Sequence, residues 1–520
     1  MQYPELGPDF HQAELIETID AAAEALLLSP GRRAYFIGIA GISMLGLAEI
    51  AARRGLIVAG SDPAAHCDDP RWQALGIEVK TRQESQNIDD FAPDFVVYTA
   101  AIPAQNPELQ RARELGLPCL VRAAFLGLIN RQYQRVFNIA GTNGKTTTTA
   151  LTAKLLIAAD FDPTVHLGAE FSDFGGTVRL GAQNEIMVSE ACEFSGSFLA
   201  FRSTDAVILN IAHDHVDIFP ELKDVYHIFL RFALNLEPGG SLYLPTFAPE
   251  IYPFCQELLR LEPDYFSTHQ LCLYGYARDC APQPAESQRI RELLAPYAKS
   301  ELQVEALQWQ GAFASGILCN ETERAPFQIA IPGQFNLENA LAATALALGA
   351  GASLELVAAA LPSFTGAEGR FTYCGDYRGA RIIADYAHHA DSLKLTIETA
   401  LKMPHRRLHV YFQPITYSRA KANRQGFFEA LAMVDFGNMI EVYDNREADH
   451  DFSTESIVRE LRAAGREASY FPNLEEAEAH ARQVIEAGDL ALFIGASIRE
   501  VADRLAGRKS HQEHGKLKAD

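Results

Sequence analysis

The sequence predicts an α/β fold of three domains, each built on a parallel sheet with helices on both faces. Short apolar runs rich in β-branched residues alternate with amphipathic stretches along nearly all of the 520 residues. That alternation is typical of strand–helix–strand units, which form parallel sheets. At roughly 150 residues per domain, the length fits three or four domains. Two glycine-rich loops also follow directly after β-rich runs, where such folds bind their ligands.

Composition and charge narrow the class of protein. The chain has 48% hydrophobic and 22% charged residues, which is typical of soluble globular proteins. Its net charge of -22 repels nucleic-acid backbones, so we expect no nucleic-acid partner and expect local groups to hold any anionic ligand. Eight scattered cysteines and an acidic N-terminus without signal-peptide features favour a cytoplasmic protein. The apolar stretch 340–361 is interrupted by Gly349, Gly351 and Glu355, which predicts two core helices and no membrane contact.

The first predicted domain covers residues 1–131 and is Rossmann-like. Its expected strands are AYFIGI, LIVAGSD, FVVYTA and CLV, with helices over about 44–54 and 107–115. The loop GIAGISMLG (38–46) follows the first strand, but Ala40 breaks the G-x-G-x-x-G fingerprint. The loop could bind a dinucleotide or another diphosphate, or it could serve only its own helix. Asp62 ends the second strand, where a carboxylate can contact a ribose.

The second predicted domain covers residues 132–362 and carries the strongest motif. Its expected strands are VFNIAG, EIMVSE, AVILNI and SLYLP, whereas 281–310 looks less regular and 362–366 reads as a linker. AGTNGKTTTT (140–149) lies between the first strand and a helix. Such a loop can wrap phosphates with its N–H groups, while Lys145 neutralises them and Thr146 offers a hydroxyl to Mg²⁺. An ordinary glycine turn before a helix is the alternative.

Acidic and histidine residues follow two strands of this domain. They are Glu190 and Glu193 in SEACE, and Asp214, His215 and Asp217 in HDHVD. Carboxylate and imidazole groups beside a P-loop suit Mg²⁺ shared between protein and phosphates. A zinc pair, helix caps or solvated acids are the alternatives.

The third predicted domain covers residues 363–506, and a polar tail follows over 507–520. Its expected strands are RIIADY, RLHVYFQP, NMIEVYD, ASYFP and DLALFIG. DYAHH (385–389) ends the first of these strands, and Arg419 follows the second in FQPITYSR. Ligands of parallel sheets bind at the carboxyl ends of strands, so these residues are candidates for a site.

Taken together and in this order, the motifs resemble those of the Mur ligase family over about residues 34–505. GTNGKT (141–146) matches the family's ATP loop G-T-x-G-K-T. The 38–46 loop resembles the G-I-x-G-I-x-M-x-G loop of the members that add L-alanine or recycled murein tripeptide. The resemblance implies a Rossmann-like UDP-binding domain, a central P-loop ATPase-type domain and a Rossmann-like C-terminal domain.

The chain also departs from the family pattern. Cys192 and Phe194 stand in the family's E-A-D-E-S, Ala212 alters N-I-E-A-D-H, and Ile415–Thr416 replaces the His-Arg pair of Q-P-H-R-Y-S-R. These changes leave the implied reaction class in place but leave the identity of the added amino acid open.

The resemblance assigns roles residue by residue. It implies ATP contacts by Gly141, Thr142, Asn143, Gly144, Lys145, Thr146, Thr147, Asn336, Asn339, Arg370 and Asp385. It implies UDP-sugar contacts by Gly38, Gly41, Ile42, Ser43, Met44, Asp62, Thr99 and Ala100. The implied Mg²⁺ ligands are Thr146, Glu190 and His215, and the implied catalytic residues are Lys145, Glu190, His215, His388 and Arg419.

The implied activity is ATP-dependent amide formation in peptidoglycan precursor synthesis. An amino acid, best matched by L-alanine, would join the lactyl carboxylate of UDP-N-acetylmuramate through an acyl phosphate, in a monomer or homodimer. Recycling of murein tripeptide is an alternative, as is a non-catalytic Mur-like nucleotide-binding protein. A nicotinamide-dependent oxidoreductase would leave the GTNGKT loop unexplained.

Overall fold

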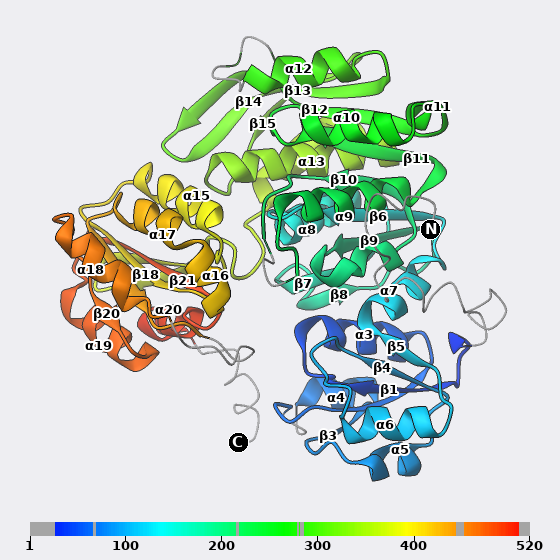
Figure 1. Cartoon of the computed structure of the whole chain (residues 1–520). Helices are drawn as coiled ribbons and strands as arrows, with labels where there is room; N and C mark the ends of the chain where they lie inside the picture. Colours follow the sequence, from blue (N-terminus) through cyan, green and yellow to red (C-terminus); the bar gives the residue numbers. More distant parts are fainter. Residues whose placement is uncertain are drawn as a thin grey trace.

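The computed structural model describes residues 27–65, 69–214, 218–277, 280, 285–443 and 452–508. These residues form three separate sheets that follow one another along the sequence (Figure 1). The expected α/β fold of three domains is therefore confirmed. Of the expected tail 507–520, all but the first two residues lie outside the described part of the chain.

The first sheet is parallel throughout and has the order β3-β2-β1-β4-β5. Its strands are β1 (Arg33–Ile37), β2 (Ile57–Ser61), β3 (Glu78–Lys80), β4 (Phe95–Tyr98) and β5 (Cys119–Val121). Its helices are α3 (Ile42–Arg53), α4 (Pro70–Leu75), α5 (Ser85–Phe91), α6 (Pro107–Glu114) and α7 (Arg122–Asn130). Because strand order reverses between β1 and β4, the loop after β1 opens at the crevice where such sheets bind ligands.

The second sheet is the largest, with the order β15-β14-β13-β12-β11-β10-β6-β9-β7-β8. Its strands are β6 (Arg135–Ala140), β7 (Thr164–Phe171), β8 (Gly176–Arg179), β9 (Ile186–Ala191), β10 (Ser203–Ile208), β11 (Leu236–Pro245), β12 (Gln270–Tyr276), β13 (Ala298–Gln310), β14 (Phe313–Cys319) and β15 (Arg324–Gln328). The helical segments are α8 (Lys145–Ala158), η2 (Phe194–Ala200), α9 (Leu222–Leu234), α10 (Ile251–Leu261), α11 (Tyr265–Thr268), α12 (Ala285–Leu294), α13 (Gln334–Ala350), α14 (Leu354–Ala360) and η3 (Leu361–Ser363). The P-loop strand β6 lies between β9 and β10, so the ends of all three strands meet.

Two expectations for this domain are wrong. The sheet is not wholly parallel, because β7 pairs with β8, and β13, β14 and β15 pair with one another, in antiparallel fashion. The described part of 281–310 is regular: it holds α12 and the 13-residue strand β13. Most side chains of β13 are exposed or half-buried, so apolar residues are too sparse there to give the alternation of a buried strand.

The third sheet has the order β16-β17-β21-β18-β19-β20, and only its edge strand β16 runs antiparallel. Its strands are β16 (Thr372–Tyr377), β17 (Ala380–Asp385), β18 (Leu408–Gln413), β19 (Phe436–Ile440), β20 (Tyr470–Phe471) and β21 (Leu490–Gly495). Its helices are α15 (Ala390–Leu401), α16 (Tyr417–Ala422), α17 (Arg424–Leu431), α18 (Glu455–Ala463), α19 (Leu474–Val484) and α20 (Arg499–Leu505). The central strands β18 and β21 are buried along their whole length because helices cover both faces.

The apolar stretch 340–361 forms most of α13 and all of α14, as expected. Gly351 ends α13 in the left-handed region, with φ 104°, which suits a glycine. Among the described residues, no helix combines the length and apolar character needed to cross a bilayer.

The first domain packs on the middle domain through α3, which contacts β7 and β8. A Cβ on Gly46 would lie 2.8 Å from Val178 Cγ2 and 3.0 Å from Thr177 Oγ1, so the helix can approach this closely only with glycine. Nearby, His166 Nε2 lies 3.1 Å from the carbonyl oxygen of Ser43 and 3.3 Å from its hydroxyl. Burial lowers the pKa of His166 to about 4, so its ring is neutral at pH 7.

Replacing Gly46 by valine should therefore destabilise the protein. The added side chain must displace Val178 and Thr177, which we expect to cost about 1–3 kcal/mol as an overpacked interface. Thermal unfolding measures the loss. Gly176→Val, in β8, is the matched control because a Cβ there meets nothing within 4 Å. Equal melting temperatures for the two variants would contradict the close approach of α3.

His166 should make stability depend on pH. Its folded-state pKa of about 4 lies below the unfolded value of about 6.5, so the unfolded chain takes up the proton first as pH falls. The contribution of His166 is thus present above about pH 6.5 and is lost towards pH 4. Between pH 7 and 5 the wild type should lose on the order of 1–2 kcal/mol more than His166→Gln. Parallel stability curves for the two proteins would count against this burial.

Candidate functional site

The loop from Gly141 to Gly144 connects β6 to α8. Both glycines have positive φ, 144° and 89°, and α8 begins at Lys145. A Cβ on Gly144 would collide with the side-chain oxygen of Asn339, so the position requires glycine for space as well as for conformation. Asn339 also accepts a hydrogen bond from Thr148 Oγ1 at 3.2 Å, which brings α13 against the start of α8. Asn336, one turn earlier, donates to the carbonyl of Pro332 at 2.7 Å.

The segment after β10 holds this loop in shape. Asn210 Oδ1 accepts from the N–H of Asn143 at 2.8 Å, and Asn210 Nδ2 donates to the carbonyl of Asn143 at 3.0 Å. The N–H of Ala212 donates to Thr142 Oγ1 at 2.9 Å. The loop is therefore preorganised by the neighbouring strand end.

Lys145 points back over the loop. Its Nζ donates to the carbonyls of Gly141, at 2.5 Å, and Thr142, at 3.1 Å, and to Glu193 Oε2 at 3.0 Å. The side chains of Lys145 and Glu193 are only 15% and 2% exposed. Burial lowers the pKa of Lys145, but the Glu193 carboxylate and Cys192 outweigh it, so the net shift is upward. The ammonium group of Lys145 therefore stays charged beside the carbonyls of the 141–144 loop.

A hydroxyl group and a carboxylate that could bind a metal ion lie next to Lys145. Thr146 Oγ1 donates to Glu190 Oε2 at 3.0 Å, and the other oxygen of Glu190 accepts from the N–H of Gly168 at 2.6 Å. A hydroxyl and a carboxylate are ligands that Mg²⁺ prefers, so these two residues fit that ion. Within the described residues no group of three or more His, Cys, Asp and Glu side chains forms a metal site. The third expected ligand, His215, lies outside the described residues, as does Asp217.

The third domain reaches this site with two arginines. Arg370 Nη2 lies 3.4 Å from Thr146 Oγ1, and its guanidinium stacks 4.8 Å above the ring of Tyr386. Arg419 Nη2 pairs with Asp214 Oδ1 at 3.2 Å. Thr416, one of the departures from the family pattern, caps the short helix α16 that carries Arg419.

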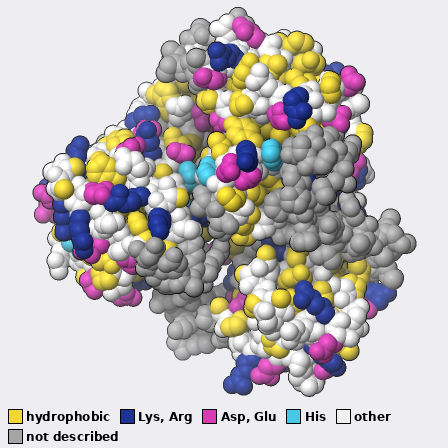
Figure 2. All heavy atoms as spheres, viewed as in Figure 1, with side chains coloured by type: hydrophobic (Ala, Val, Ile, Leu, Met, Phe, Trp, Pro, Cys, Tyr) yellow, Lys and Arg dark blue, Asp and Glu magenta, His cyan; other side chains and the backbone are white. Residues whose placement is uncertain are grey.

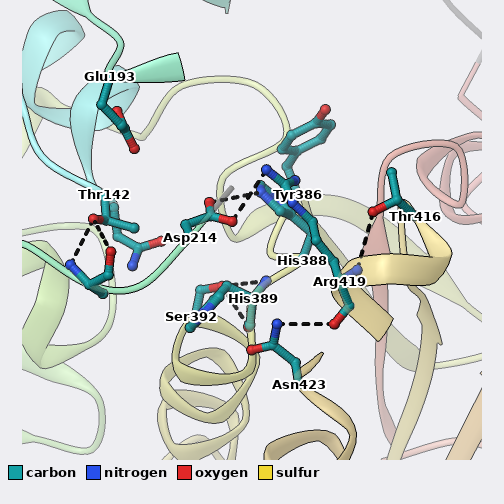
Figure 3. A network of polar contacts seen from close by, with 12 residues as sticks. Thr142, Glu193, Asp214, Tyr386, His388, His389, Ser392, Thr416, Arg419 and Asn423 are labelled. Carbon is teal, nitrogen blue, oxygen red and sulfur yellow. Dashed lines mark hydrogen bonds and ion pairs between the residues drawn. The ribbon is translucent and has the colours of Figure 1, made fainter. Parts of the chain in front are cut away.

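Histidines complete the contact between the two domains (Figure 3). His388 Nε2 lies 3.9 Å from Asp214 Oδ2, and His389 Nε2 lies 3.1 Å from the carbonyl oxygen of His213. Burial lowers the pKa of His388 to about 4, with the nearby Arg419 acting in the same direction. In the space-filling view, histidine side chains are visible where the third domain meets the middle domain (Figure 2).

The carboxylate of Asp385 forms its hydrogen bonds within the third domain. Its oxygens accept from the N–H groups of Phe371 and Ala387, both at 2.7 Å, and from Thr396 at 3.4 Å. Burial raises the pKa of Asp385, and these hydrogen bonds and Arg370 oppose the rise. The carboxylate fixes the segment that carries Tyr386, His388 and Arg370.

The residues expected to contact UDP-sugar surround the loop after β1. The N–H of Gly38 donates to the carbonyl of Ser61 at 2.7 Å, and Thr99 lies close enough to Gly38 to exclude a side chain there. Asp62 accepts from the N–H groups of Ala40, at 3.1 Å, and Ala64, at 2.9 Å. Gly41 is the residue before α3.

The side chains on this loop face different ways. Ile42 is 47% exposed and Ala100 is exposed, so both are open to a ligand. Met44 is 2% exposed and packs into the core of the first domain, so only its backbone could face one. Ser43 is engaged with His166 and with Arg122.

Sequence reasoning missed several partners in this site. It noted Glu193 and Asp214 as acids near the P-loop, but not that Glu193 pairs with Lys145 or that Asp214 bridges to Arg419. It attached no role to Asn210 or Arg122. Their positions after β10 and after β5 were the available signal, because strand ends in parallel sheets converge.

Comparisons with known proteins show which family the chain belongs to. Sequence models match residues 33–134 as "Mur ligase family, catalytic domain", 139–252 as "Mur ligase middle domain" and 369–497 as "Mur ligase, glutamate ligase domain". Two relatives are named UDP-N-acetylmuramate–L-alanine ligase. The protein from Lachnospira eligens is 35% identical over 89% of this chain and 95% of its own, and that from Agathobacter rectalis is 36% identical over 91% and 97%.

A solved structure matches as well. The UDP-N-acetylmuramate–alanine ligase of Thermotoga maritima superposes with a TM-score of 0.69 and 25% identity, covering 91% of this chain and 98% of its own. The predicted resemblance is confirmed: the chain belongs to the Mur ligase family.

Proposed function

We propose that the chain is an ATP-dependent ligase that joins UDP-N-acetylmuramate to L-alanine in the cytoplasm. The observation that carries this proposal is the buried Lys145 ammonium in a preorganised P-loop, next to the Thr146–Glu190 pair and within reach of Arg370. The names of the two relatives at 35% and 36% identity supply the substrates.

ATP would bind with its phosphates in the 141–144 loop. The N–H groups of that loop and the start of α8 attract negative charge, and Lys145 neutralises the outer phosphates. The rest of the nucleotide would contact Asn336, Asn339 and Arg370, and Asp385 would act by holding the segment that carries Arg370 in place. A bound Mg²⁺ held by Thr146, Glu190 and His215 would screen the phosphate charges.

The first chemical step forms an acyl phosphate. A lactyl carboxylate oxygen attacks the γ-phosphorus, the bond to the bridging oxygen breaks, and ADP leaves with the electron pair. Lys145 and Arg370 stabilise the charge that spreads over the phosphoryl oxygens. Closure of the third domain keeps water from the reactive intermediate.

The second step forms the amide. The amino group of L-alanine attacks the carbonyl carbon, inorganic phosphate leaves, and the nitrogen loses a proton. His388 would accept a hydrogen bond from that amine, because its low pKa keeps the imidazole neutral and the Tyr386 carbonyl, 3.0 Å from Nδ1, favours a proton on Nδ1. Nε2 is then free to accept. The same low pKa makes His388 a weak base, so the proton leaves with the released phosphate. Arg419, oriented by Asp214, would hold the carboxylate of the amino acid.

Phosphate release from ATP and Mg²⁺ tests the function. We expect release to require both UDP-N-acetylmuramate and L-alanine when single amino acids and the free murein tripeptide are compared. A requirement for the tripeptide would replace the proposal with the recycling reaction. If no acceptor gives phosphate release, despite tight ATP binding, a non-catalytic nucleotide-binding protein would be favoured instead.

Lys145→Ala should abolish ligation while the fold survives. Among the described residues, the ammonium group contacts only two loop carbonyls and Glu193, so its loss removes transition-state charge stabilisation and the partner of one buried carboxylate, but little packing. We expect turnover to fall by roughly a thousandfold or more, with a nearly unchanged circular dichroism spectrum. Lys154→Ala, on the same helix and paired with Asp173, is the control. Ligation within tenfold of wild type would remove Lys145 from the mechanism.

A further inference from the structure

Arg122 is the first residue of α7 and lies where the first domain meets the middle domain. Helix α7 packs against η2 of the middle domain, which follows β9 and Cys192. The guanidinium Nη1 donates to the hydroxyl of Ser43, in the first turn of α3, at 3.1 Å. Arg122 therefore ties the loop expected to hold the UDP-sugar to a helix that packs on the segment after β9.

Arg122 has no acidic partner among the described residues. The hydrogen bond to Ser43 is its one polar contact there, and no carboxylate lies within 4.0 Å. Two other arginines with low exposure pair with an acid: Arg291 with Glu301 and Arg419 with Asp214. The remaining nitrogens of Arg122 are not among the buried atoms that lack a partner, so they still contact solvent.

A cation in this position is costly without an anion. Burial lowers the pKa of Arg122, and Cys192 and Glu190 oppose that shift, so both lie near the guanidinium. A guanidinium nevertheless keeps its charge in proteins, and its partial removal from water costs free energy that an anionic partner would offset. The open nitrogens of Arg122 therefore form a ready site for an anionic group that enters between the domains.

We propose that Arg122 binds the carboxylate of the UDP-linked substrate and holds it facing the ATP site. This assignment rests on the proposed function, in which that carboxylate must travel from the UDP-sugar loop to the phosphates at Lys145. Arg122 lies at the contact between the two domains on this route: its guanidinium is hydrogen-bonded to Ser43 of the first domain, and its helix α7 packs on η2 of the middle domain. The planar guanidinium matches a carboxylate with two parallel hydrogen bonds, and Ser43 fixes its orientation.

The experiment compares two ligands that differ at the carboxylate. UDP-N-acetylmuramate carries the lactyl group, whereas UDP-N-acetylglucosamine has the same diphosphate but no carboxylate. Binding of both to the full-length wild type and to Arg122→Gln is measured by calorimetry or competition, together with ATP affinity and melting temperature. We expect Arg122→Gln to bind UDP-N-acetylmuramate about 10- to 100-fold more weakly, with UDP-N-acetylglucosamine and ATP unchanged.

Arg54→Gln is the matched control. Arg54 follows the other end of α3 and bridges the same two domains through Tyr133 and Asn184, away from the loop. It should leave both affinities unchanged. If Arg122→Gln does not fold, Arg122→Lys, which keeps the charge but loses the fork, should still weaken UDP-N-acetylmuramate selectively.

The other outcomes overturn the assignment. Equal weakening of both ligands would place Arg122 on the diphosphate, and unchanged affinities would make it a structural residue. Failure of the wild type to bind UDP-N-acetylmuramate would instead overturn the proposed function itself.

Discussion

The ammonium group of Lys145 lies in a buried pocket where its charge must be balanced on every side. Two loop carbonyls and the carboxylate of Glu193 provide that balance, and Glu193 comes from the segment after β9. The loop can curl around the lysine because Gly141 and Gly144 have positive φ and because Asn339 leaves no room for a side chain at Gly144. The position of β6 between β9 and β10 brings these groups together.

The first and third domains both contact the middle domain near Lys145. Arg370 and Arg419 bring two further positive charges from the third domain, and Asp214 of the middle domain pairs with the second of them. The first domain is held by α3, where Gly46 permits a close approach and Ser43 contacts both His166 and Arg122. The 38–46 loop is therefore tied through Ser43 to two residues at the contact between the first and middle domains.

The sequence predicts the parts of this structure that depend on local pattern. Buried strands such as β18 and β21 are visible in the sequence as continuous apolar runs. The GTNGKT motif predicts both the turn and the helix that follows it. The sequence does not predict β13, whose exposed side chains give no hydrophobic period. The sequence also does not predict the ion pairs Lys145–Glu193 and Asp214–Arg419, because each joins residues far apart in the chain. Strand ends identify the candidates, but only the fold selects the partners.

The proposed reaction requires the three domains to bring a carboxylate to the γ-phosphate of ATP and the amide to form through an acyl phosphate. The most direct measurement uses UDP-N-acetylmuramate whose lactyl carboxylate carries a heavy oxygen isotope. During ligation to L-alanine, we expect one labelled oxygen per turnover to appear in the released inorganic phosphate. Released phosphate without label, together with amide product, would contradict it.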